Sequence, residues 1–498
     1  MPVLDYLRGF APEAQPAFVR RSYARELVGE LSLVFPLAVL EAGVVGIIAT
    51  LLFDVGSLGL ATIVAAPMFA NLTSTVWARL LHGRAKARML GVFLSIFLAV
   101  AVAIALLPTD PSSATALVLL YVLSRCVFAG VITTRTVIWR ANYPRHSRSR
   151  ITGRLMLINT FLLATLPVGA AYLFDTYQAD HPWLFRAVYL SAAAVGVVGV
   201  VAYSGLRVRR ERALRREELN PTIGSGDTPG PPVRISPIQV LRDDKHFRSY
   251  MIWQFCAGVA TMAGNTAMIA LIATQADALP EDWKISLFGL VEIKAYMVGI
   301  FLASVVMLLF VALSIPFWAH YLDKVHVTRF RTRHGLWWIA TQASSLVVAY
   351  LIAVSAAPLA WLLVLLIVPR ICQGLVFGGG RLAWQLGHHD FADRHLAATY
   401  MAIHQTLTGV RGFTAPFLGV LLYTGWETTR FAIIDLPAFD LAGLQIPAIH
   451  SGYFTITGWS GIGYWVFAIT LVFAIIGWAG FVHLDKQVGG DGAAQTHD

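Results

Sequence analysis

The chain has 498 residues, of which 57% are hydrophobic and only 13% are charged. A soluble protein of this length needs more charge to cover its surface, so the composition excludes a soluble globular class. The formal net charge of +10 could suggest nucleic-acid binding. The cations instead gather in short segments between long apolar runs, which is typical of a multi-pass membrane protein.

About twelve apolar runs are long enough to cross a bilayer as helices, since a hydrocarbon core of about 30 Å needs about 20 apolar residues. They lie at roughly 31–53, 58–79, 89–107, 115–139, 152–174, 184–206, 249–273, 290–318, 336–354, 359–382, 397–423 and 461–483. The fold class predicted from them is an all-α integral membrane protein with two pseudo-symmetric six-helix bundles.

A charged and proline-rich stretch, 207–248, separates the two sets of apolar runs. A division into six and six spans is the layout of a two-bundle secondary transporter. We therefore expect five parts: an N-terminal segment 1–30, a bundle 31–206, a linker 207–248, a second bundle 249–484 and a tail 485–498.

The basic residues also predict the orientation. Ten of the 38 Lys and Arg residues lie in 207–248, whereas the opposite loops hold about two, Lys284 and Arg430. This bias predicts that the linker and both termini are cytoplasmic, in what we expect to be a bacterial inner (plasma) membrane. On the other side, the long segment 424–460 is predicted to cover the outer mouth or to act as a lid.

The two halves repeat weakly. Arg125 and Trp139 in the fourth predicted span recur as Arg370 and Trp384 in the tenth, in each case 245 positions later. Arg is costly inside a bilayer, so a matched pair of Arg residues supports an internal repeat.

Several motifs resemble those of the major facilitator superfamily, and the resemblance extends over about 31–484. PRICQG, which holds Arg370, Gln373 and Gly374, is similar to the family's Arg-x-x-Gln-Gly motif. IPFWAHYLDKV resembles the loop motif that follows the second span of a bundle. The first-half version of that loop, VWARLLHGRAKAR, keeps its cations but has lost the acidic residue.

The resemblance implies a gating role for these loops. Asp323 is expected to contact the inner end of a neighbouring helix and to hold the cytoplasmic side closed. Its loop partner Lys324 and the first-half cations Arg79 and Arg84 belong to the same predicted gate. The alternative is a plain surface ion pair.

Charged residues inside the predicted spans are candidates for function. Glu41 and Arg125 lie near the middle of spans 1 and 4, which line the central cavity in the family that the chain resembles. We expect the two to approach each other, with Glu41 as a candidate proton carrier. The alternative is a structural ion pair that bridges the two spans.

The second half offers candidates for binding the substrate. Arg370 and Arg411 have no evident acidic partner at the same depth, and Arg binds carboxylate or phosphate groups well. The alternative is that they bond to backbone carbonyls. Further polar candidates are Asn71, Gln254, Asn265, Gln373 and His404.

The predicted function is secondary active transport of a small solute by alternating access, with proton coupling. The solute is either an amphipathic compound for efflux or an organic anion. A non-transporting membrane protein of the same fold, acting as an assembly factor or sensor, is the alternative. We expect no enzyme activity, no cofactor, no nucleic-acid partner and a monomer in the lipid bilayer. The isolated run GHHDFADRH does not predict a metal site.

Overall fold

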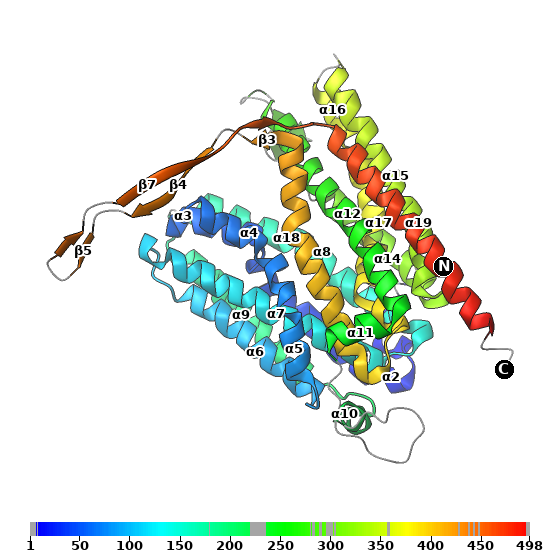
Figure 1. Ribbon diagram of the computed structural model, residues 1–498. Coiled ribbons are helices and arrows are strands. Elements are labelled where there is room, and N and C mark those ends of the chain that lie inside the picture. Colours follow the sequence, from blue (N-terminus) through cyan, green and yellow to red (C-terminus); the bar gives the residue numbers. More distant parts are fainter. Residues whose placement is uncertain are drawn as a thin grey trace.

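The computed structural model describes most of the chain. The described residues are 6, 8–178, 180–219, 236–278, 280, 284–287, 291–294, 302, 305–355, 359–426, 429–436, 439–441, 444–446 and 449–494. Figure 1 shows two groups of long helices, one from each half of the chain, which lie closer together at the end where α10 and α11 are found. We call this end the linker end.

The N-terminal half consists of eight α-helices. They are α2 (Ala17–Val39), α3 (Ala42–Phe53), α4 (Ser57–Leu72), α5 (Ser74–Leu81), α6 (Lys86–Ala105), α7 (Ala114–Asn142), α8 (Arg145–Tyr177) and α9 (Leu184–Ser204). Two short 3-10 helices, η1 (Pro12–Ala14) and η2 (Pro111–Ser113), precede α2 and α7.

The linker contributes α10 (Glu211–Leu219) and α11 (Pro237–Asp243). The C-terminal half contains α12 (Lys245–Asp277), α14 (Val306–Lys324), α15 (Val327–Val354), α16 (Leu359–Leu365), α17 (Ile367–Leu386), α18 (Ala397–Thr424) and α19 (Trp465–Ala494). The 3-10 helices η4 (Gly387–Asp390) and η5 (Arg394–Leu396) connect α17 to α18.

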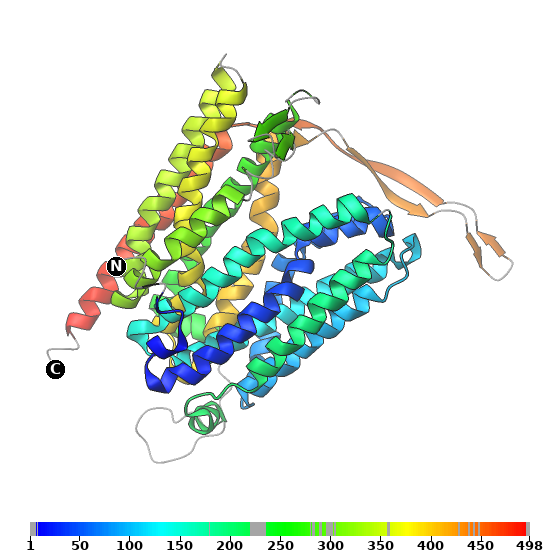
Figure 2. The ribbon, with the colours of Figure 1, turned by 180° about the vertical axis from the view of Figure 1, so that it is seen from behind.

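Short antiparallel strand pairs lie at the other end of the molecule. In the C-terminal half, β1 (Lys284–Leu287) pairs with β2 (Val291–Lys294). In the predicted outer segment, β3 (Gly425–Trp426) pairs with β8 (Trp459–Ser460), β4 (Thr429–Leu436) with β7 (Ile449–Ile456), and β5 (Phe439–Leu441) with β6 (Leu444–Ile446). Figures 1 and 2 show this ribbon projecting away from the helices.

Ten helical segments in the described part of the chain are long and apolar enough to cross a membrane, or eleven when α4 and α5 count as one bent span. Helix α18 is not among them, since His404 and Arg411 lower its hydropathy, yet it packs against α12 and α4. The expected all-α membrane fold with two bundles is confirmed.

The first span begins earlier than the sequence suggested. Helix α2 starts at Ala17, so half of the predicted segment 1–30 is continuous with the first span. Two acidic residues in this stretch, Glu26 and Glu30, are buried and have polar partners on other helices. The span then breaks after Val39, and Glu41 is the residue that precedes α3.

The linker packs against the first half through an ion pair. The Glu218 carboxylate accepts hydrogen bonds from the Lys86 ammonium and the Gly83 backbone N–H, both at 2.7 Å. Glu211 accepts one from the Lys86 backbone N–H at 2.8 Å. Helix α10 therefore supplies acidic groups to the first-half loop, which has no acidic residue of its own. Residues 220–235 of the predicted linker lie outside the described residues.

Replacing Glu218 with Ala should destabilise the protein strongly. Lys86 has no exposed side-chain area and the Glu218 side chain only 3%, and leaving one partner of a buried pair alone costs about 3–5 kcal/mol. We expect a lower thermal unfolding midpoint in detergent and faster proteolysis at α10. Glu217→Ala on the exposed face of α10 is the matched control. Equal midpoints for the two variants would contradict this role for Glu218.

Candidate functional site: a cavity between the two halves

A cavity of about 520 Å³ lies between the two halves of the protein. Helices α2, α4, α7 and α8 line it from the first half, and α12, α15, α17, α18 and α19 line it from the second. Its charged lining residues are Glu30, Glu41, Arg125, Arg135, Arg331, Arg381 and Arg411. Aromatic rings, among them Trp139, Trp338, Trp384 and Trp478, form much of the remaining wall.

Glu41 and Arg125 meet in this cavity, as the sequence led us to expect. Glu41 lies at the break between α2 and α3, and its carboxylate is 3.7 Å from the Arg125 guanidinium. The Glu41 side chain is 46% exposed, whereas that of Arg125 is 7% exposed. Arg125 also donates to the Tyr121 hydroxyl at 3.1 Å. The pair is thus loose and open to the cavity on its acidic side.

Glu30 is a second acidic group in the cavity wall, which the sequence analysis missed. It forms an ion pair with Arg135 and accepts hydrogen bonds from the Tyr203 hydroxyl at 3.0 Å and the Asn159 amide at 3.4 Å. Glu26, one helical turn earlier, accepts from Trp139. The four-residue spacing of Glu26 and Glu30, just ahead of an apolar run, was the signal that places both on one helical face.

Arg370 does not line the cavity. It is fully buried, and its guanidinium donates to the Leu302 carbonyl and to the Asn265 side-chain oxygen, both at 3.0 Å. Gln373 donates to the same Asn265 oxygen at 2.9 Å. Of these three predicted binding residues only Asn265 reaches the cavity wall. The Arg370 cluster joins helices within the second half, in agreement with the alternative of bonding to backbone carbonyls.

Arg411 does line the cavity, and its position depends on a glycine. Its guanidinium donates to the Gln254 carbonyl at 2.6 Å, and a Cβ atom on Gly258 would lie only 2.0 Å from Arg411 Nη1. The Nε atom of Arg411 is buried and has no hydrogen-bond partner among the described residues. Gln254 also lines the cavity.

Of the two remaining predicted binding residues, Asn71 lines the cavity and His404 does not. Asn71 lines the cavity and donates to the Pro67 carbonyl at 3.2 Å, next to the bend between α4 and α5. His404 is buried behind the wall, against the rings of Tyr250 and Trp384.

Arg381 is a further lining residue that the sequence analysis did not select. It extends from α17 and donates to the Thr160 hydroxyl of α8 at 2.8 Å, so it joins the two halves. It also interacts electrostatically with Glu41. Its signal in the sequence was an Arg directly after three glycines in a predicted span, where small residues permit close helix packing.

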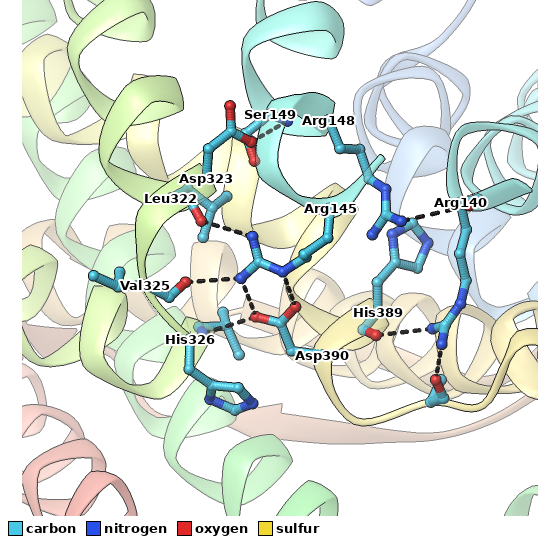
Figure 3. Close-up of polar contacts among 12 residues, drawn as sticks. Arg140, Arg145, Arg148, Ser149, Leu322, Asp323, Val325, His326, His389 and Asp390 are labelled. Atoms are coloured by element: carbon cyan, nitrogen blue, oxygen red, sulfur yellow. Dashed lines mark hydrogen bonds and ion pairs between the residues drawn. The ribbon is translucent and has the colours of Figure 1, made fainter. Parts of the chain in front are cut away.

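At the linker end a polar network closes the space between the halves (Figure 3). Asp323 of α14 accepts from the Ser149 backbone N–H at 2.7 Å and from Arg150 Nε at 2.9 Å, both on α8. Arg145 forms an ion pair of 2.7 Å with Asp390. It also donates to the Leu322 and Val325 carbonyls at 3.0 and 2.7 Å.

A second arginine adds hydrogen bonds between the two halves at the linker end. Arg140 of α7 donates to the backbone carbonyls of His389, at 2.8 Å, and Ala392. Of the four residues predicted to form a gate, Asp323 makes this contact between halves, whereas Lys324, Arg79 and Arg84 are exposed. In the described part of the chain, no group of three or more acidic, His or Cys side chains could hold a metal ion.

Replacing Arg145 with Ala should widen the linker end, because this variant loses the Asp390 ion pair and two carbonyl hydrogen bonds at once. Spin labels at positions 84 and 324, in a cysteine-free background, would report the distance between the halves by double electron–electron resonance. We expect a longer mean distance in the variant. Arg79→Ala is the control, and an unchanged distribution in Arg145→Ala would count against the network as a closure.

Three solved structures with a similar fold are of membrane transporters. The transporter FucP in its outward conformation matches with a TM-score of 0.60 and 12% identity, over 93% of this chain and 99% of that one. The E. coli fucose:proton symporter FucP, in a variant form, matches with a TM-score of 0.59 and 12% identity over the same shares. A bacterial homologue of the iron transporter ferroportin, in an outward-facing state, matches with a TM-score of 0.56 and 11% identity, again over 93% and 99%.

At these identities the likeness establishes the fold alone. A comparison with curated protein sequences returned no match. The family model of the Major Facilitator Superfamily matches residues 31–434, which is most of the chain and extends from the first half through α18 of the second. Together with the membrane-spanning helices and the two-bundle fold, this match shows that the protein belongs to the major facilitator superfamily.

Proposed function

We propose that this secondary transporter moves a small organic anion by alternating access and couples the movement to protons. The observation that carries the proposal is the cavity between the halves, which is closed by polar contacts at the linker end and holds the Glu41–Arg125 pair. Substrate sites of such transporters lie near the bilayer midplane, where the two repeats meet.

The charge of the cavity wall favours an anion. Five arginines and two glutamates line it, so the described wall carries a formal excess of three positive charges. Arg411 keeps a buried nitrogen, Nε, without a hydrogen-bond partner among the described residues, and Arg125 Nη2 makes only the 3.7 Å contact with Glu41. Since Arg binds carboxylate and phosphate groups with paired hydrogen bonds, an anionic group is the complementary ligand. The tryptophan rings suit an apolar or aromatic body on the same solute.

Glu41 is the proposed proton carrier. Its carboxylate is half-exposed to the cavity and forms only a 3.7 Å contact with Arg125, so protonation would release Arg125 at a small structural cost. Glu30, in contrast, is enclosed by Arg135, Tyr203 and Asn159, which suits a structural role. The fucose:proton symporter has a similar fold, which is consistent with proton coupling but does not extend its sugar substrate to this chain.

The orientation completes the proposal. The linker end carries most of the basic residues, and we place it in the cytoplasm of a bacterial inner membrane. The cavity between the halves then belongs to a state in which the cytoplasmic side is closed. A non-transporting protein of the same fold would need no open volume between its bundles, so the cavity counts against that alternative.

Replacing Glu41 with Gln should uncouple transport from protons. In proteoliposomes, pH-gradient-driven accumulation is expected to fall to the level of empty vesicles. Counterflow, which exchanges solute without net proton movement, should persist. Glu30→Gln is the comparison, since it should lower thermal stability instead. Undiminished pH-gradient-driven accumulation by Glu41→Gln would exclude the proton role.

The substrate class is testable before any substrate is known. A thermal-shift screen of organic anions, organic cations and neutral sugars against the purified protein should give stabilising hits among the anions. Arg411→Gln should weaken these hits by a factor of about 10 to 100, since a hydrogen bond to a charged group is worth about 1.5–3 kcal/mol. Hits only among cations or neutral compounds would contradict the anion assignment while leaving transport itself open.

A further inference from the structure

A second space, separate from the central cavity, lies on the surface of the protein where the two halves are in contact. It is a groove of about 810 Å³ between α8 and α14. Its walls are mainly apolar, with Phe161 and Leu162 on α8 and Leu309, Leu313 and Phe317 on α14. Phe161, Leu313 and Phe317 are each about three-fifths exposed, at 59%, 62% and 64%.

The groove faces the bilayer and not the cavity. On α8, Met156, Asn159 and Leu163 line the cavity, whereas Leu157 and Phe161 line the groove. Residues three and four positions apart share a helical face, so these two sets lie on different faces of α8. Any occupant of the groove at this depth must therefore come from the hydrocarbon region of the membrane.

The groove becomes polar at its linker end. Tyr6, His320 and Lys324 line it there. The Tyr6 hydroxyl and His320 Nδ1 are buried and have no hydrogen-bond partner among the described residues. Tyr6 as a whole is only 2% exposed. Burial raises the pKa of the Tyr6 hydroxyl, which therefore stays protonated and able to donate a hydrogen bond. Lys324 is exposed and adds a positive charge.

The position of the polar residues on α14 matches the level of the lipid headgroups. The 19 residues Val306–Lys324 form a candidate membrane span, and at 1.5 Å per residue they rise by about 28 Å, close to a hydrocarbon core of about 30 Å. Lys324 therefore lies at the linker-side end of the span, where lipid headgroups begin, and His320 lies one helical turn before it. Lys and Tyr are well suited to a phosphate at this level, because they combine a charge with a hydrogen-bond donor.

We propose that this groove binds an anionic phospholipid of the linker-side leaflet. One acyl chain lies between Phe161 and Leu313, and the phosphate is held by Lys324 and the Tyr6 hydroxyl. The lipid then contacts both halves of the protein, next to the contact between Asp323 and Arg150. Its binding favours the state in which the linker end is closed.

The test compares lipids that differ only in the headgroup. Native mass spectrometry of the full-length protein in detergent would measure retention of phosphatidylglycerol and of phosphatidylcholine with identical chains. We expect one phosphatidylglycerol per protein to be retained preferentially and to raise the thermal unfolding midpoint. Glycerol phosphate without acyl chains should do neither, because the groove contributes most of the contact area.

Two variants distinguish binding of the lipid headgroup from binding of its acyl chain. Lys324→Gln should reduce the preference for phosphatidylglycerol about fivefold, since a basic residue near the membrane surface is worth about that factor. Ala312→Trp should fill the groove and reduce retention of both lipids, while Val197→Trp on the exposed face of α9 should not.

Equal retention of the two lipids by the wild-type protein would overturn the proposal. So would unchanged retention in Lys324→Gln, which alters an exposed side chain and leaves the fold testable even if Ala312→Trp fails to fold. Neither outcome depends on the transported solute, so the result stands apart from the proposed function.

Discussion

The cost of placing a charge away from water governs this structure more than any other interaction. Charged residues that are removed from water require a partner or a water-filled cavity. Glu30 meets this requirement with Arg135, Lys86 with Glu218, and Arg370 with Asn265 and the Leu302 carbonyl. Each pairing joins helices that are distant in sequence, so the same requirement fixes how the helices pack.

Where the requirement is only partly met, the residues face the cavity between the halves. Glu41 lies at a helix break and contacts Arg125 loosely, and Arg411 keeps one buried nitrogen without a partner among the described residues. In the proposed function, these incompletely paired groups are the ones that bind the solute or a proton. The fully paired groups hold the scaffold that positions them.

Equivalent positions in the two halves make different contacts. Arg125 and Arg370 are equivalent by the repeat, but one faces the cavity and the other is enclosed within its bundle. The loop of the second half contacts the first half through its own Asp323, whereas the loop of the first half binds Glu211 and Glu218 from the linker. The linker helix is thus part of the folded protein at the linker end. The proposed lipid groove lies at the same contact between α8 and α14. The bound headgroup and the polar network around Asp323 would therefore both oppose opening of the linker end.

The sequence by itself determined the class of fold, since long apolar runs in water-free surroundings form helices, and the basic segment between them divides the chain in two. It also selected Glu41, Arg125, Arg411 and Asp323 as candidates, because a charge in or beside an apolar run is unusual, and the structure places the first three at the cavity and Asp323 at the contact between the halves. Only the tertiary structure decided that Arg370 is enclosed, that Glu30 and Arg381 reach the cavity, and that Glu218 completes a distant loop. A charge is visible in one sequence, but its partner is set by which helices pack together, and that is decided by contacts across the whole fold.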